Sequence, residues 1–180
     1  NPELNAEDLR LLKTISTAFL NIYEESKALE YLEKLAKIEN NNPESMLEVS
    51  EVCINLTLFQ KAYNWANKAI STGKLLDKAY YQRAEVLVAV AEYNMSDEID
   101  FCDRLVYDLA YFDYDLAYQN GNFNAKIFMN QIEELITSRG DWFLNADSKL
   151  KISPGSEDCA KLKQSDCYLW INKEVKTKDK

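Results

Sequence analysis

Two consecutive stretches of the chain can be laid over each other without a gap: residues 9–42, LRLLKTISTAFLNIYEESKALEYLEKLAKIENNN, and residues 43–76, PESMLEVSEVCINLTLFQKAYNWANKAISTGKLL. At this offset of 34 residues apolar positions fall on apolar positions, as in Leu12 on Met46, Ile15 on Val49 and Phe19 on Cys53. Such a period is typical of a repeated helix pair, which buries its apolar faces only by stacking on the next pair. The sequence therefore predicts an all-α fold, an α-α superhelix of antiparallel helix pairs.

The pattern of large and small residues is also specific. The first stretch carries Leu12, Ile15, Ser16, Phe19, Ala28, Leu32 and Leu35, and the second carries Met46, Val49, Ser50, Cys53, Ala62, Ala66 and Ala69. This arrangement resembles the tetratricopeptide repeat (TPR) family. The match continues more loosely from Asp77, and Arg83 stands where the family has leucine. The resemblance implies a concave wall that binds a protein or peptide segment.

The apolar periodicity predicts helices and no strands. The helices are expected near residues 6–22, 25–39, 44–56, 59–73, 77–93, 97–119 and 123–138, with Asn42 as an N-cap. The turn Ser153-Pro154-Gly155 divides the chain into a TPR-like domain, residues 1–152, and a cysteine-bearing C-terminal cap or tail, residues 153–180. Residues 173–180 are expected to be a solvated end.

Composition excludes several classes of function. A formal net charge of −9 and a pI near 4.7 argue against nucleic acid as a partner, because phosphate binding needs a basic surface. No apolar run approaches the roughly 20 residues that span a bilayer, so no membrane insertion is expected. The chain has no histidine and no glycine-rich phosphate loop, so we expect no enzyme activity, no cofactor and no metal site.

The segment from residue 97 to residue 118 is acidic and rich in tyrosine. Acidic residues on one long helix, among them Asp97, Asp100, Asp103, Asp108 and Asp115, are expected to form a solvated face. The tyrosines at 107, 111, 114 and 118 follow one helical stripe, which allows two interpretations. They pack between helices, or they line a binding wall beside acidic residues that suits a peptide with apolar anchors and a basic residue.

The candidate binding groove lies on the first helix of each pair. Its residues project away from the positions that the TPR pattern assigns to packing, and they are Lys13, Asn21, Glu48, Glu51, Asn55, Lys78, Tyr81 and Glu85. Some TPR domains grip a C-terminal carboxylate through a clamp whose positions fall here on Lys13, Thr17, Glu48, Lys78 and Gln82. Glu48 would repel such a carboxylate, so the partner is expected to be basic or neutral.

Two hypotheses for function follow. The chain is a noncatalytic scaffold or adaptor for protein–protein interaction, or it is a structural oligomerisation domain whose concave surface is filled by its own chain or by a second copy, as in a homodimer.

The cysteines divide into two kinds. Cys53 and Cys102 lie in apolar helical patterns and are expected to be reduced and buried. The spacing of Cys159 and Cys167 is similar to that of the cysteine pairs in Sel1-like repeats, and this resemblance implies a disulfide between them, with two free thiols as the alternative. The chain begins Asn1-Pro2, which fits a mature exported form, for instance periplasmic, or a piece of a longer protein. A cytoplasmic location is the alternative if the thiols are free.

Overall fold

A computed structural model describes residues 6–96, 98–146 and 149–177 of the chain. The helices are α1 (Ala6–Asn21), α2 (Glu25–Ile38), α3 (Pro43–Asn55), α4 (Phe59–Ser71), α5 (Leu76–Asn94), α6 (Phe101–Gln119), α7 (Ala125–Ile132), α8 (Arg139–Asn145) and α9 (Glu157–Lys163). The strands are β1 (Lys151–Ile152) and β2 (Val175–Lys176). Within these described ranges, no helix combines the length and the apolar character needed to cross a bilayer.

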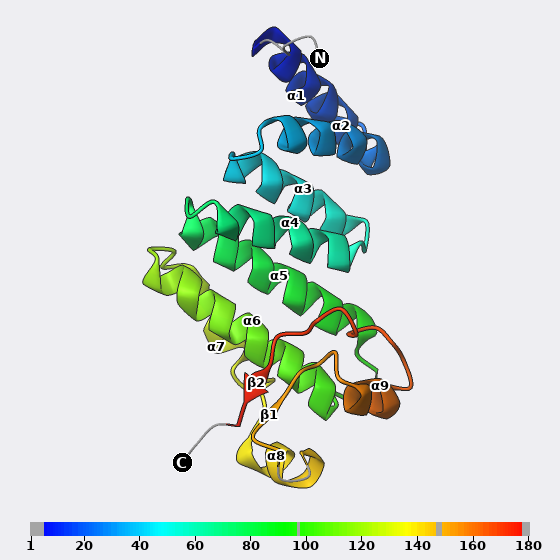
Figure 1. Cartoon of the computed structure of the whole chain (residues 1–180), viewed down its shortest axis with the longest axis vertical. Coiled ribbons are helices and arrows are strands. Elements are labelled where there is room, and N and C mark those ends of the chain that lie inside the picture. The colour runs from blue at the N-terminus through cyan, green and yellow to red at the C-terminus, as the bar shows by residue number, and fades with distance from the viewer. Residues whose placement is uncertain (1–5, 97, 147–148, 178–180) are drawn as a thin grey trace.

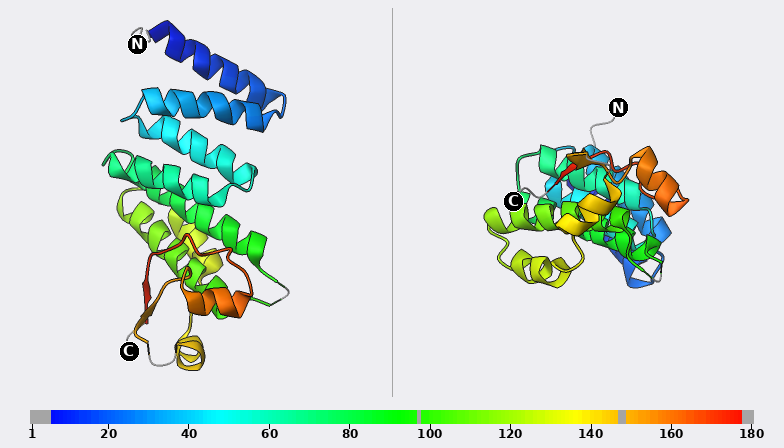
Figure 2. Two further views of the ribbon diagram at one scale, coloured as in Figure 1. Left: turned by 45° about the vertical axis from the view of Figure 1, so that its right-hand side comes forward. Right: turned by 90° about the horizontal axis from the view of Figure 1, so that it is seen from below.

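The helices stack in chain order from α1 towards α8 (Figure 1). Each predicted pair forms, with α1 against α2, α3 against α4 and α5 against α6. The pairs in turn touch through α2 with α3 and α4 with α5, and the turned view in Figure 2 shows the same succession. The predicted all-α superhelical arrangement is therefore confirmed.

The start of α3 follows from its cap. The Asn42 side chain accepts a hydrogen bond from the Glu44 N–H at 3.1 Å, and Pro43 occupies the first turn, where its missing N–H has no helical partner to lose. The predicted N-cap is confirmed.

The start of α6 differs from the predicted residue 97, which lies outside the described residues. The helix begins at Phe101 because Asp100 caps it, accepting hydrogen bonds from the N–H groups of Cys102 at 2.8 Å and Asp103 at 3.0 Å. The Asp103 carboxylate in turn accepts from the Asp100 N–H at 3.1 Å. This reciprocal capping box fixes the helix end.

The predicted single helix over residues 123–138 is wrong. The chain leaves α7 at Ile132, and a second capping box, formed by Ser138 and Asp141, starts α8. The break lies where Thr137 turns inward: its hydroxyl donates to Asp108 on α6 at 2.6 Å, and the Trp142 indole donates to Thr137 at 2.8 Å. These buried bonds hold the turn against α6.

The prediction of no strand is also corrected, on a small scale. β1 and β2 pair antiparallel, with Lys151 opposite Lys176 and Ile152 opposite Val175. The pair closes the C-terminal segment back on itself and extends no further in the described part of the chain. Residue 152, the predicted domain boundary, is thus the last residue of β1.

Residues 153–177, here called the C-terminal segment, run back across α5 and α6 (Figure 1). Tyr168 and Ile171 are buried in the same core as α5, α6 and α7. The segment folds tightly at Gly155, where a Cβ atom would lie 2.7 Å from the Ile171 carbonyl oxygen, so only glycine fits.

The disulfide joins Cys102 on α6 to Cys159 on α9, with their Cα atoms 5.6 Å apart. The pairing implied by the Sel1-like spacing is therefore wrong, because Cys167 is free. Cys102 is buried as expected but is not reduced, while Cys53 is both buried and free. The sequence spacing misled because the partner of Cys159 lies on a helix that precedes it by 57 residues.

Asp103 and Asp108 on α6 are buried, so the predicted solvated acidic face is wrong for them, and Asp113 on the same helix is fully buried as well. The Asp103 carboxylate accepts a hydrogen bond from the Tyr168 hydroxyl at 2.6 Å and pairs with the Lys163 ammonium at 2.7 Å. Burial disfavours the charged lysine, but its hydrogen bonds to Asp103 and Asp100 outweigh burial and raise the pKa of Lys163. Two parts of the C-terminal segment are thereby held on the first turn of α6.

Asp113 forms the second buried ionic contact. The Arg83 guanidinium on α5 donates to both of its carboxylate oxygens at 2.7 Å, and Lys173 of the C-terminal segment lies 3.3 Å from one of them. A bidentate guanidinium is the geometry that best compensates a buried carboxylate. Lys173 therefore belongs to the packed structure, although residues 173–180 were predicted to be solvated.

The disulfide gives a first prediction. Alkylation of the unreduced, denatured chain should label Cys53 and Cys167 only, and peptide mapping should recover a cross-link between Cys102 and Cys159. A double Cys102→Ala/Cys159→Ala variant should lose about 4 kcal/mol of unfolding free energy in denaturant titration, because the bridge closes a long loop in the unfolded chain. Recovery of a link between Cys159 and Cys167 would refute this pairing.

The buried ion pair gives a second prediction. Asp113→Asn should lower the unfolding free energy by about 3–5 kcal/mol, since it leaves the Arg83 charge buried without a counter-charge. The matched control is Asp115→Asn on the same helix, which removes a half-buried carboxylate that accepts from Gln119 and should change stability by no more than about 0.5 kcal/mol. Equal effects of the two variants would contradict the assigned role of Asp113.

Candidate functional site

A hollow of about 280 Å³ lies between α1 and α3 and is here called the α1–α3 groove. It is lined by Lys13, Ser16, Thr17, Leu20, Leu32, Glu48, Glu51, Val52 and Asn55. Four of the eight predicted groove residues are therefore brought together here. Leu32 on α2 closes the floor between the two helices that carry the others.

The local sequence explains why these side chains converge. On α1, residues 13, 16, 17 and 20 recur at intervals of three and four, and on α3 residues 48, 51, 52 and 55 do the same. Side chains at this spacing lie on one face of a helix. Because the repeat places the two helices in equivalent positions, the two faces look towards the same hollow.

The groove has an apolar floor and an acidic rim. Leu20, Leu32 and Val52 supply the apolar surface. On the rim, the Lys13 ammonium lies 3.7 Å from the Glu48 carboxylate; the Lys13 side chain is largely in solvent and the Glu48 side chain is partly exposed. Such a pair is weak and can be exchanged for a contact with a ligand.

The remaining rim groups sharpen this charge pattern. The Asn55 amide donates to Glu25 at 3.2 Å, whereas Glu51 is exposed and has no ion-pair partner within the described residues. The groove therefore carries a net negative potential next to an apolar surface.

Asn21 lies in an adjoining hollow of about 390 Å³ on α1, lined by Arg10, Lys13, Thr14, Thr17, Ala18 and Asn21. The two hollows share Lys13 and Thr17. The Thr14 and Thr17 hydroxyls donate to the backbone carbonyls one turn earlier, at 2.8 and 2.9 Å, so their donor protons are used within the helix while their oxygens can still accept. The two hollows form a continuous surface along α1.

The α5 residues of the predicted site lie elsewhere. Lys78 is exposed and lines neither hollow, while Tyr81 and Glu85 are half-buried. The Tyr81 ring packs on Tyr114 at 5.5 Å and on Phe128 at 5.3 Å, and Glu85 accepts a hydrogen bond from the Tyr114 hydroxyl. The site that the structure assembles is therefore centred on the first two helix pairs.

Packing of α7 against α5 and α6 also changes the chemistry of these tyrosines. Burial, followed by the nearby Glu85 carboxylate, raises the pKa of Tyr81 to about 12. The same causes raise the pKa of Tyr114 further. Both phenols stay protonated at neutral pH and act as hydrogen-bond donors.

The tyrosine stripe on α6 serves mainly to pack helices. Tyr107 and Tyr114 are almost fully buried, and Asp108 and Asp113 beside them are buried as well. Tyr118 is partly exposed and stacks edge-on against Phe123 at 5.9 Å. The packing interpretation thus describes Tyr107 and Tyr114. Tyr111 instead lines a hollow of about 480 Å³ between α6 and the C-terminal segment, together with Asp108, Asp115 and Lys173.

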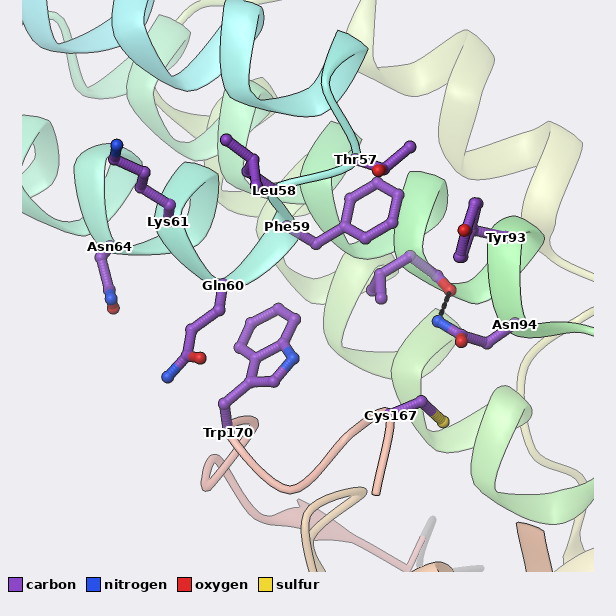
Figure 3. Close-up of a pocket in the computed structure, with 11 residues that line it drawn as sticks. Thr57, Leu58, Phe59, Gln60, Lys61, Asn64, Tyr93, Asn94, Cys167 and Trp170 are labelled. Atoms are coloured by element: carbon purple, nitrogen blue, oxygen red, sulfur yellow. Dashed lines mark hydrogen bonds between the residues drawn. The ribbon is translucent and has the colours of Figure 1, made fainter. Parts of the chain in front are cut away.

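Sequence reasoning missed a separate hollow of about 540 Å³, away from the two hollows on α1 and here called the second hollow. The C-terminal segment forms it with α4 and α5 (Figure 3). It is lined by Thr57, Leu58, Phe59, Gln60, Lys61, Asn64, Val90, Tyr93, Asn94, Cys167 and Trp170. A signal for it was present: Trp170 stands in the apolar run of residues 167–171, CYLWI, within the tail. Without the fold, nothing placed that residue against α4.

A metal centre is not assembled in the part of the chain that the structure describes. No group of three or more histidine, cysteine, aspartate or glutamate side chains could hold a metal ion there. The neighbouring carboxylates Asp100 and Asp103 are engaged by Lys163 and by the helix cap.

The chain matches no protein-family model, no curated protein and no solved structure. Its function is therefore inferred from the residues that line these hollows.

Proposed function

We propose that the protein is a noncatalytic interaction scaffold that binds a peptide or protein segment in the α1–α3 groove. The observation that carries the proposal is the gathering of Lys13, Glu48, Glu51 and Asn55 around an apolar floor. Exposed polar side chains that surround apolar surface in a hollow are the usual composition of a peptide-binding site. The resemblance of residues 9–76 to TPR repeats supports the same use of this surface.

The charge of the groove selects the partner. Glu51 is unpaired among the described rim residues and Glu48 is held only by a loose contact with Lys13, so a basic side chain on the partner gains attraction from both. The half-buried Leu20 offers contact to an apolar side chain, above Leu32 and Val52, which are almost fully buried. The partner is therefore a protein segment with an apolar anchor and a basic or neutral flank.

A structural role through a second copy is the alternative, and the exposed face of α1 favours it. Leu11 is 57% exposed and Ala18 is exposed, whereas the residues equivalent to them in the next repeat, Ser45 and Val52, are buried. A second copy that covered this face would form a homodimer with α1 at its interface. Sedimentation equilibrium at 100 μM, a concentration on the order of the dissociation constant of a weak dimer, tests this alternative. A protein that is still monomeric at that concentration would contradict it.

The groove proposal is tested with two blocked peptides of equal length, one with leucine and lysine and one with leucine and glutamate. The native protein should bind the lysine peptide more tightly in calorimetric titration. The variant Glu48→Lys/Glu51→Lys should weaken that binding roughly five- to tenfold, because each reversed rim charge turns an attraction into a repulsion of up to about 1 kcal/mol.

The matched control is Glu30→Lys/Glu133→Lys, which changes net charge equally through exposed residues outside the groove. It should alter the affinity less than twofold at 0.15 M salt, where charges more than about 8 Å apart are screened. Equal weakening by the two double variants, or tighter binding of the glutamate peptide by the native protein, would remove the groove as the site.

A further inference from the structure

The second hollow is built from three segments that are far apart in the sequence. Residues 57–64 provide one wall, residues 90–94 at the end of α5 a second, and Cys167 and Trp170 a third (Figure 3). Ring contacts join these walls: Phe59 packs on Tyr93 at 5.3 Å, and Trp170 packs edge-on against Tyr63 at 5.3 Å. Because the C-terminal segment is tied to α6, Trp170 is held in place before any ligand arrives.

The aromatic side chains of the hollow are accessible. Tyr93 is 66% exposed, and Phe59 and Trp170 are half-buried. The other two tryptophans of the chain, Trp65 and Trp142, are only 4% and 5% exposed. Trp170 is thus the tryptophan that the fold leaves within reach of a ligand.

Several hydrogen-bond donors of the hollow have no acceptor among the described residues. The Trp65 indole N–H donates to Glu33 and the Trp142 indole N–H donates to Thr137. For the Trp170 indole N–H, and for the Gln60 and Asn64 carboxamides, the described residues supply no partner. These groups are free to donate to a ligand that brings carbonyl oxygens.

The hollow offers no unpaired charge. Lys61 is the charged residue of the lining, and its ammonium lies 3.0 Å from the Glu33 carboxylate. No carboxylate is among the lining residues. The ligand that fits this surface is therefore neutral where it touches the protein.

From these observations we propose that this hollow binds a neutral, proline-rich segment of another protein in the polyproline II conformation. Proline has no backbone N–H, so such a segment presents carbonyl acceptors and flat apolar rings, which match unpaired donors set among exposed aromatic rings. Its conformation is largely fixed in solution, so binding in an open hollow costs little additional entropy.

Other peptide conformations fit less well. An α-helical segment uses its carbonyls internally and would leave the Trp170 N–H without an acceptor. A segment that adds a strand needs the free edge of a strand, whereas none of the residues that line this hollow lies in a strand. The polyproline II segment is the form that meets both the rings and the donors.

The test uses acetyl-hexaproline-amide as the probe, with acetyl-hexaalanine-amide and maltotriose as comparison ligands. Intrinsic fluorescence should change saturably with hexaproline, because Trp170 is the exposed reporter. In a ¹H–¹⁵N spectrum one of the three indole N–H resonances should shift. The titration extends to 5 mM hexaproline, roughly the dissociation constant of a very weak complex. The absence of a saturable change up to that concentration would overturn the proposal. An equal response to maltotriose or to hexaalanine would overturn it as well.

Two variants locate the binding. Tyr93→Ala removes an exposed ring and should weaken hexaproline binding roughly five- to tenfold; Tyr118→Ala, which removes a partly exposed ring on α6, should leave it unchanged. Trp170→Phe keeps a ring against Tyr63 but removes the indole N–H. Calorimetry should show that this variant binds hexaproline about fivefold more weakly, or weaker still. Thermal unfolding of each variant controls for folding, and unaltered affinity in the folded Tyr93→Ala protein would refute the site.

Discussion

The buried carboxylates of α6 are the constraint on which the C-terminal half of the molecule depends. An aspartate that is taken out of water must find cationic or hydrogen-bonding partners, because an uncompensated buried charge costs several kcal/mol. Asp103 finds Lys163 and Tyr168, Asp108 finds Thr137, and Asp113 finds Arg83 and Lys173. Each carboxylate thereby ties a neighbouring segment of the chain to α6.

The spacing of these aspartates explains why one helix can organise so many neighbours. They are five residues apart, and five residues turn an α-helix by about 140° beyond a full turn. Successive carboxylates therefore point in different directions around α6, towards the C-terminal segment, the α7–α8 turn and α5. The Cys102–Cys159 bridge adds a covalent tie at the same end as Asp103. The arrangement makes the C-terminal segment a part of the solenoid and lets Trp170 form a wall of the second hollow.

Local patterns in the sequence predicted the helices well and the long-range contacts poorly. The helical spacing of apolar residues gave α1 to α5 to within about two residues, which is the normal uncertainty of helix ends. The caps at Asp100 and Ser138 were visible as residue types, but the pattern could not tell them from other acidic and hydroxyl residues nearby. Arg83 was the clearest missed signal: it broke the repeat pattern at a position that faces Asp113, and a charge at a packing position requires a buried partner.

The same limit applied to the cysteines and to the site. Spacing suggested a local bridge to Cys167, whereas the actual partner of Cys159 is brought near by the path of the C-terminal segment over α6. For the groove, helical periodicity found the residues on α1 and α3, because equivalent positions in stacked repeats share a face. It could not show that α7 packs through Phe128 against Tyr81, since the apolar periodicity of that segment indicates a packed face but not which residues the face contacts.

Native-state hydrogen exchange, with the disulfide intact, tests the central role of α6 most directly. If its buried carboxylates hold the C-terminal segment as part of one cooperative unit, the amides of Gly155 and Ile171 should exchange with free energies within about 1 kcal/mol of the most protected amides of α6. Their dependence on denaturant should also match. Exchange of Gly155 and Ile171 through a separate opening of much lower free energy, while α6 remains protected, would contradict the account.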